Sequence, residues 1–322
     1  LSSKAKLAGL VMACLVLGVL PPFYSSYWIT LFTQMLIYAI AAMSLDVLLG
    51  YTGLTSFGHA GFFGCAAYVV AVMVTRYKIG FFTCFVSGVG LATFIGAIFG
   101  LLVAHASGVG FLMITLALGM CLWGLAFRWV NMTGGDNGIS GIVRPDLGLP
   151  IALKNPLTYY YFVLVIFIIV VILLFIIVRS PFGHSLKGIR ESESRMKVLG
   201  YHTWLHKYLS YVVASAFAGV AGVLWAYFDG FVSPYNMDLT ASIEIILMVI
   251  LGGPGTLIGP ALGSCIIVFL KNFISAYTQR WLLIVGTIYI FTILYAPQGL
   301  MNLLRDWIRG GEKKVEPEVK GV

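Results

Sequence analysis

Residues 158–178 read TYYYFVLVIFIIVVILLFIIV, an apolar run without a charged side chain. A helix of about 20 apolar residues crosses the hydrocarbon core of a bilayer. Over the whole chain of 322 residues, 60% are hydrophobic and 10% are charged. Soluble domains contain about 45–50% apolar and about 25% charged residues. The composition therefore predicts a polytopic membrane protein without a soluble catalytic domain.

Ten apolar blocks recur along the chain, and each is a candidate span. They lie at 7–20, 28–49, 54–75, 82–104, 109–130, 158–178, 208–228, 241–253, 257–276 and 281–297. Blocks 241–253 and 281–297 are interpreted as either full spans or re-entrant segments. Block 7–20 resembles a signal sequence, but Pro21-Pro22 follows it where a small-residue cleavage site would stand. We interpret it as a first span or an anchor, and the natural N-terminus stays open.

The basic residues predict the orientation of the spans. If the N-terminus lies inside and ten spans alternate, 13 of the 20 Lys and Arg residues fall on the inside, as the positive-inside rule expects. Both termini and segment 179–207 are then cytoplasmic, and loops 131–157 and 229–240 are periplasmic. We expect an all-α transmembrane permease domain over 1–308 and a charged cytoplasmic tail over 309–322.

Several function classes are disfavoured by what the sequence contains. Its basic residues sit between apolar blocks, so they indicate topology and contact with membrane lipid, not nucleic-acid binding. The five cysteines (Cys14, Cys65, Cys84, Cys121 and Cys265) fall in apolar runs and are interpreted as small buried hydrophobic residues. No P-loop, HExxH, G-x-S-x-G or zinc-ligand spacing occurs. We expect no catalytic residue, metal or cofactor in this chain.

The cytoplasmic segment 179–207 is predicted to form a short amphipathic helix between Pro181 and Gly200. Its mixed charges favour docking to a protein partner, and a plain surface helix on lipid headgroups is the alternative. The predicted docking residues are Ile189, Arg190, Glu191, Glu193, Arg195, Met196, Leu199 and Gly200.

Two glycine-rich stretches, 50–68 and 241–263, interrupt apolar blocks. Such glycines indicate either broken backbone that lines a pathway or very close helix packing. The pathway candidates are Gly53, Ser56, Gly58, His59, Gly61, Glu244, Gly253, Gly255 and Gly259. The similarity of the two stretches indicates either an internal repeat, which in transporters points to the pathway, or chance.

Three polar positions leave alternatives open. His59 is either a substrate contact or proton relay, or a residue that holds the break by bonding backbone. Glu244 has either an interfacial position or an interior role. The same two alternatives apply to Asp46, near the inner end of its span. Asp136 and Asn137 suit a turn, with calcium ligation as the weaker alternative.

Six motifs occur in an order similar to that of a known family. They are SLDVLLGYTGLTSFGHAGFFGCAAY (44–68), WVNMTGGDNGISGI (129–142), SPFGHSLKGIRESESRMKVLGY (180–201), FVSP (231–234), SIEIILMVILGGPGTLIGPALG (242–263) and APQGL (296–300). With them the chain resembles the LivM-type permeases of bacterial branched-chain amino-acid ABC importers. The resemblance implies a type II importer fold in the inner membrane and a coupling helix around Ile189–Gly200. Glu191 and Glu193 depart from the Glu-Ala-Ala loop of other ABC importers, which favours the vitamin-importer-like type.

The resemblance also implies partners and a substrate class. The partners are a second homologous permease, two cytoplasmic subunits that bind ATP and Mg, and a periplasmic binding protein. Branched-chain or other small hydrophobic amino acids are the expected substrates, with urea, short amides or aromatic acids as alternatives within the family. An ion-coupled secondary transporter is the competing class, for which only Asp46, His59 and Glu244 offer intramembrane sites.

Overall fold

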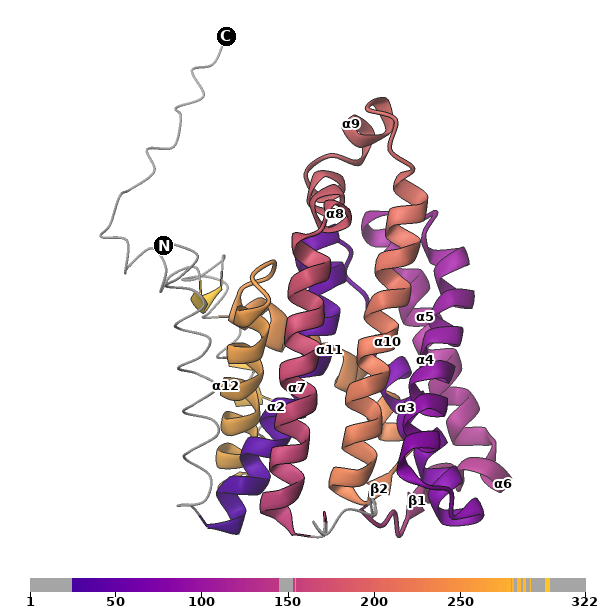
Figure 1. Ribbon diagram of the computed structural model, residues 1–322, viewed down its shortest axis with the longest axis vertical. Helices are drawn as coiled ribbons and strands as arrows, with labels where there is room; N and C mark the ends of the chain where they lie inside the picture. Colours follow the sequence, from indigo (N-terminus) through magenta and orange to yellow (C-terminus); the bar gives the residue numbers. More distant parts are fainter. Residues whose placement is uncertain are drawn as a thin grey trace, which may run out of the picture.

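The computed structural model describes residues 25–144, 153, 155–278, 280, 283–284, 286–287, 290 and 299–301. Eleven α-helices lie in this part of the chain, and seven helical stretches are long and apolar enough to span a membrane. These are Ser26–Thr52 (α2, Ser26–Asp46, continued by η2, Val47–Thr52), α3 (His59–Tyr77), α4 (Phe81–Val103), α5 (Gly108–Arg128), α7 (Pro156–Arg179), α10 (Thr203–Asp229) and α12 (Ile258–Ser275). Figure 1 shows them as one bundle, which confirms the predicted polytopic helical fold.

One candidate span is a shorter helix. Helix α11, Leu239–Gly252, has 14 residues and covers about 21 Å at about 1.5 Å per residue. The hydrocarbon core of a bilayer is about 30 Å thick, so of the two alternatives for block 241–253 the structure disfavours the full span. Block 7–20, most of block 281–297 and the tail 309–322 lie outside the described residues.

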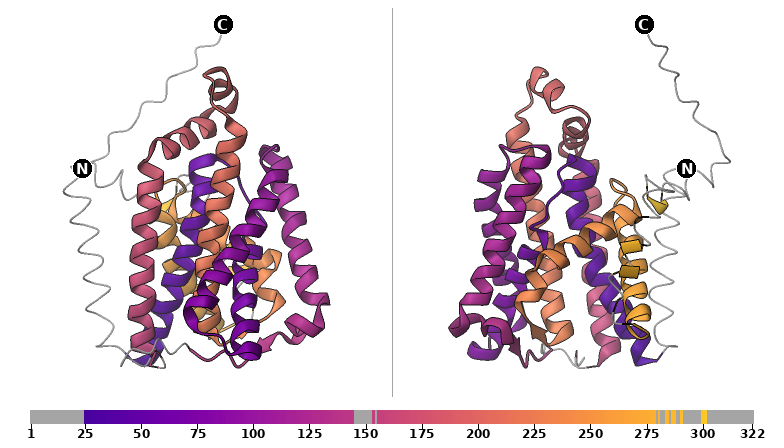
Figure 2. Two further views of the ribbon diagram at one scale, coloured as in Figure 1. Left: turned by 45° about the vertical axis from the view of Figure 1, so that its right-hand side comes forward. Right: turned by 180° about the vertical axis from the view of Figure 1, so that it is seen from behind.

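Helices α2, α3 and α10 form the buried centre of the bundle, whereas α4, α5, α7 and α12 each expose one face (Figure 2). Small residues permit the closest approaches. On α4, Gly88, Ala92, Gly96 and Gly100 recur every four residues, and all four are buried. A Cβ atom on Gly96 would overlap Ser215 of α10. This repeat of small residues lets two membrane helices pack backbone to backbone.

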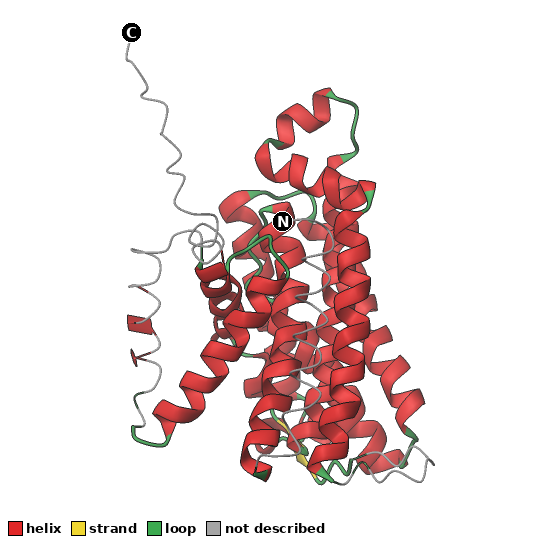
Figure 3. Ribbon diagram, turned by 60° about the vertical axis from the view of Figure 1, so that its left-hand side comes forward, coloured by secondary structure: helices red, strands yellow, loops and turns green. Residues whose placement is uncertain are grey.

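The two ends of the bundle carry different connections. At one end lie α8 (Pro181–Glu191) and α9 (Glu193–Val198), and at the other lie α6 (Val130–Thr133), η3 (Gly135–Asn137), η4 (Pro234–Met237) and two short strands (Figure 3). Strands β1 (Ile139–Ser140) and β2 (Phe231–Val232) pair antiparallel, with Ile139 opposite Val232. The predicted periplasmic loops therefore lie together, opposite the predicted cytoplasmic segment.

The structure also shows where the cysteines lie and what Asp136 and Asn137 form. Among the described cysteines, Cys84 is buried, but Cys121 is exposed on the outer face of α5, which corrects its expected burial. Asp136 and Asn137 lie in the η3 turn, where the Asp136 carboxylate accepts a 3.1 Å hydrogen bond from the Tyr235 hydroxyl. No group of three His, Cys, Asp or Glu side chains suited to a metal ion occurs among the described residues.

Candidate functional site

The first glycine-rich stretch breaks the backbone between α2 and α3. The last turns of α2 widen into η2, and Gly53 ends them in the left-handed conformation at φ +76°. Glycine adopts that conformation without the steric cost that a Cβ atom brings. No regular helix is present again until α3 begins at His59, whose side chain is fully buried.

The second glycine-rich stretch breaks the backbone between α11 and α12. Gly253 and Gly255 have φ values of +108° and +82°, and Leu257 is a non-glycine residue with a positive φ of +58°. Positive φ at a bulky residue persists only where surrounding contacts hold it. The contact that holds Leu257 comes from α2.

Asp46, at the end of α2, binds the backbone of this second break. Its carboxylate accepts hydrogen bonds from the backbone N–H groups of Gly255, at 2.7 Å, and Leu257, at 3.1 Å. The side chain of Asp46 is fully buried. Two main-chain donors of a turn without regular hydrogen bonding are thereby satisfied by one buried carboxylate. The two breaks also touch, because a Cβ atom on Gly50 would overlap the backbone nitrogen of Gly255.

Arg190 of α8 reaches the same place. Its guanidinium donates a hydrogen bond to the carbonyl oxygen of Gly50. A Cβ atom on Gly53 would lie 3.0 Å from the Arg190 side chain, and one on Gly255 would lie 3.0 Å from its guanidinium. We call this set the glycine junction. It consists of Asp46, Gly50, Gly53, Arg190, Gly255 and Leu257.

The predicted amphipathic helix is two helices. Helix α8 ends at Glu191, and Ser192, in extended backbone, caps α9 by accepting a 3.3 Å hydrogen bond from the Arg195 backbone N–H. Ile189 and Met196 are buried within this chain, with Met196 packed against Gly188. The predicted docking residues that are exposed are Arg190, Glu191, Arg195, Leu199 and Gly200, although the Arg190 guanidinium also reaches Gly50.

Val198 is a docking candidate that sequence analysis missed. Its side chain is 89% exposed, beside Leu199 at 71%. A surface hollow of about 510 Å³ adjoins these two residues. It is lined by Lys197, Tyr201, His202, Thr203, Trp204 and Leu205. Adjacent exposed aliphatic side chains at a helix end are a feature of surfaces that bind another protein.

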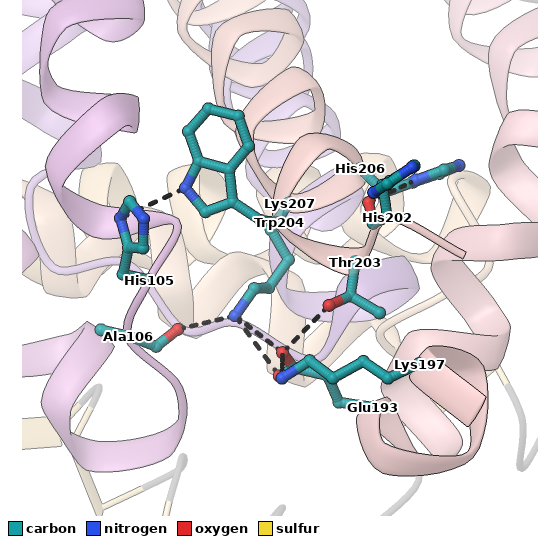
Figure 4. Close-up of polar contacts among 9 residues, drawn as sticks. All are labelled: His105, Ala106, Glu193, Lys197, His202, Thr203, Trp204, His206 and Lys207. Carbon is teal, nitrogen blue, oxygen red and sulfur yellow. Dashed lines mark hydrogen bonds and ion pairs between the residues drawn. The ribbon is translucent and has the colours of Figure 1, made fainter. Parts of the chain in front are cut away.

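Glu193 anchors α9 to the start of α10 (Figure 4). Its carboxylate lies 2.9 Å from the Lys197 ammonium and 3.2 Å from that of Lys207, and it accepts a 3.3 Å hydrogen bond from the Thr203 hydroxyl. Burial raises the pKa of Glu193, but the hydrogen bond from Lys197 and the charge of Lys207 outweigh it and lower the pKa overall. Glu193 is therefore ionised at neutral pH.

The pathway candidates around α3 are packing positions in this structure. Ser56 and His59 are fully buried, and His59 Nε2 forms a 2.7 Å hydrogen bond with the Ser44 hydroxyl of α2. This partner is a side chain, whereas the structural alternative predicted a bond from His59 to backbone. A Cβ atom on Gly58 would overlap the Thr115 carbonyl of α5, and one on Gly61 would lie 2.9 Å from the Leu122 side chain.

The candidates on α11 and α12 fall into two places. Gly253 and Gly259 pack in the turn between the helices, where a Cβ atom on Gly259 would overlap Thr256. Glu244 lies far from that turn and forms an ion pair of 2.9 Å with Lys271 of α12. The Glu244 side chain is 11% exposed, so it has an interior partner and not a free interfacial position. The predicted pathway residues therefore do not form a single cluster.

Sequence analysis identified part of this arrangement. It left Asp46 open between an interfacial and an interior position and did not identify its partners, and it placed Arg190 on the exposed face without its contact with Gly50. It counted Lys207 only as a cytoplasmic charge, whereas this side chain is 3% exposed. A lysine one turn inside an apolar helix was the available signal, because such a residue needs a partner.

The family of the chain follows from comparison with known proteins. The family model for the permease component of branched-chain amino acid transport systems matches residues 27–294, from the start of α2 to beyond α12. The chain belongs to this family. It is a multi-pass membrane permease of the branched-chain amino-acid ABC transport family, which is a family of transporters and not of enzymes. The resemblance inferred from the six motifs is confirmed.

Individual relatives of this permease agree with the family. The high-affinity branched-chain amino acid transport system permease protein LivM of Salmonella typhimurium LT2 is 29% identical, over 95% of this chain and 78% of its own length. LivM of Escherichia coli K12 is 29% identical over 93% of this chain and 76% of its own length. LivH of Escherichia coli K12 is 28% identical over 38% of this chain and 40% of its own length. No solved structure matches the chain.

Proposed function

We propose that this permease is the LivM-like subunit of an ABC importer in a bacterial inner membrane. With a second, related permease it forms the pathway for branched-chain amino acids. ATP hydrolysis on two cytoplasmic subunits drives transport, and a periplasmic binding protein delivers the substrate. The observation that carries the proposal is the family match over residues 27–294. The partial similarity to LivH, named as another permease of such a system, supports a heterodimer of related permeases.

The glycine junction offers a route for the driving force. The ATP-binding subunits dock on the outward face of α8 and α9, at Arg195, Val198 and Leu199. A displacement of α8 then moves Arg190, which is hydrogen-bonded to the first break and packed on the second. Alternating access requires two packings of the bundle that are close in energy. Two touching backbone breaks supply the hinge points for such a change.

The competing ion-coupled class requires intramembrane ionisable groups that are free to bind an ion. The two carboxylates are engaged elsewhere, because Asp46 binds backbone N–H groups and Glu244 binds Lys271. His59 binds Ser44 through Nε2. Within the described residues the charged and polar groups therefore favour a subunit that depends on partners for energy.

The test is uptake by the reconstituted complex. The permease, a second permease and two ATP-binding subunits are placed in proteoliposomes with the binding protein outside and ATP inside. We expect ATP-dependent accumulation of leucine, isoleucine and valine, and none in a complex whose ATP-binding subunits cannot hydrolyse ATP. Accumulation of urea, a short amide or phenylalanine in place of these amino acids would overturn the substrate assignment. Accumulation by this chain alone without nucleotide would overturn the ABC mechanism.

A further inference from the structure

The segment between α7 and α10 contains two helices that are attached to different parts of the bundle. Helix α8 is held at its C-terminal end by Arg190, which binds the glycine junction. Helix α9 starts two residues later, after the extended residue Ser192. The backbone thus permits α9 to be positioned by its own contacts.

Lys207 connects α9 to α10 and to the turn between α4 and α5. Its ammonium donates a 3.0 Å hydrogen bond to the carbonyl oxygen of Ala106 and a 3.3 Å hydrogen bond to Glu193 Oε2. Ala106 belongs to the turn between α4 and α5, and Glu193 begins α9. One buried lysine therefore joins three elements (Figure 4): α9, the first turns of α10, and the α4–α5 turn.

A second contact joins the start of α10 to the α4–α5 turn. The Trp204 indole N–H donates a 3.2 Å hydrogen bond to His105 Nδ1, and Trp204 stacks on Tyr208. The start of α10 and the α4–α5 turn are thus joined independently of Lys207. Lys207 and Thr203 extend this joint to α9 through Glu193, whereas Lys197 binds Glu193 from the exposed side, with its own side chain 62% exposed.

We propose that Lys207 is a positioning residue of the transport cycle, which fastens α9 to the α4–α5 turn through Glu193. Movement of α9 then carries α4 and α5 with it, while movement of α8 acts through Arg190 on α2 and the α11–α12 turn. Helices α8 and α9 are thus connected to two different groups of membrane helices. The role of Lys207 in transport rests on the proposed ATP-driven function. The fastening of α9 to the α4–α5 turn does not depend on that function.

The chemistry of a buried ion pair makes the fastening testable. Removing one partner of such a pair leaves the other charge poorly solvated, so the surviving group seeks another position. Loss of either Lys207 or Glu193 therefore breaks the connection of α9 to the α4–α5 turn and loosens α9. Loss of Lys197 leaves the Glu193–Lys207–Ala106 connection intact, so Lys197→Met is the matched control.

The first measurement uses the full chain in lipid nanodiscs. Spin labels are attached at Ser194 of α9 and Ser107 of the α4–α5 turn, which are both exposed, after the five cysteines are replaced by alanine. We expect a narrow distance distribution in the unmodified background and after Lys197→Met. We expect a broadened distance distribution after Lys207→Met and after Glu193→Gln. The Glu193→Gln chain retains the Lys207–Ala106 hydrogen bond, so it tests the fastening even if the Lys207→Met chain does not fold. Narrow distributions in both variants would overturn the fastening.

The second measurement concerns transport by the complete complex without labels. Glu193→Gln should lower substrate uptake per ATP hydrolysed by about fivefold or more, the scale of a typical coupling energy between sites, while Lys197→Met leaves the ratio unchanged. A merely structural role would lower uptake and hydrolysis together, so an unchanged ratio would overturn the role in transport. Absence of ATP-dependent uptake in the wild-type complex would overturn the proposed function, and the label distances would still decide whether Lys207 fastens α9.

Discussion

The carboxylate of Asp46 accepts a 2.7 Å hydrogen bond from the backbone N–H of Gly255, 209 residues further along the chain. This contact joins the end of one span to the turn between two later helices. A buried carboxylate here replaces the main-chain acceptors that a regular helix would offer. Because Arg190 binds beside it, the contact also places the break within reach of α8.

Replacing Asp46 by Asn should destabilise the glycine junction. The amide offers one acceptor oxygen, and its NH₂ group then faces the second backbone donor. Loss of one hydrogen bond to a charged acceptor costs about 2 kcal/mol. Thermal unfolding of the purified permease measures the change. The control is Asp136→Asn, whose carboxylate binds the exposed Tyr235, and which should change stability by less than about 0.5 kcal/mol. Equal stability of the Asp46 variant and wild type would contradict the assigned role.

Adding a methyl group at Gly53 or Gly255 should block transport while the substrate affinity of the binding protein stays intact. Both residues have a positive φ, and the new methyl carbon would lie 3.0 Å from Arg190. The backbone strain alone costs about 1–2 kcal/mol. Gly141→Ala is the control, because Gly141 has a φ of +85° and open space around it. Uptake at wild-type rates by the Gly53 and Gly255 variants would contradict the hinge.

Replacing Glu193 and Arg195 together should impair coupling to the ATP-binding subunits or their assembly, without preventing membrane insertion. The structure separates the two effects. Glu193→Gln alters the anchoring of α9 in the permease itself, whereas Arg195→Gln changes an exposed side chain and should weaken only the association with the ATP-binding subunits. Co-purification and transport in vesicles measure both. Unchanged transport by the double variant would count against the docking assignment.

Acidification should release α9 through Glu193. The pKa of Glu193 lies below its ordinary value of 4.5, so the ionised form is favoured in the folded protein. Its stabilising contribution is complete above pH 4.5 and is lost as the pH falls through the lowered pKa. The Ser194–Ser107 label distances should therefore broaden only in acid. The Glu193→Gln chain should show no such pH dependence, and a wild-type transition well above pH 4.5 would be inconsistent with this assignment.

The ion pair between Glu244 and Lys271 should show strong coupling in a double-mutant cycle. Glu244→Gln leaves the Lys271 ammonium without that carboxylate and should cost about 2 kcal/mol or more of stability. Adding Lys271→Met should recover most of the loss, because a pair of uncharged side chains carries no desolvation penalty. Thermal unfolding of the four chains gives the coupling energy. Simple additivity of the two single changes would refute the pairing.

The helices and the positions of both breaks could be predicted from local sequence. Hydrophobicity over about 20 residues decides whether a segment spans a bilayer, so the apolar runs from 28–49 to 208–228 correspond to helices of the bundle. Glycine clusters at 50–64 and 253–263 likewise indicated interrupted helices, because glycine permits backbone that other residues resist. The sequence left block 241–253 open between a full span and a re-entrant segment, and the structure places there the short helix α11.

The partners of the buried polar groups depended on the tertiary structure. That Asp46 binds the backbone near Gly255, and that Lys207 joins Glu193 to the carbonyl of Ala106, follows from no local pattern. Hydrogen bonds act over about 3 Å and need a defined direction, so they form only after packing brings distant segments together. Hydrophobic patterning acts along one segment and can be recognised before folding, whereas these contacts are properties of the assembled bundle.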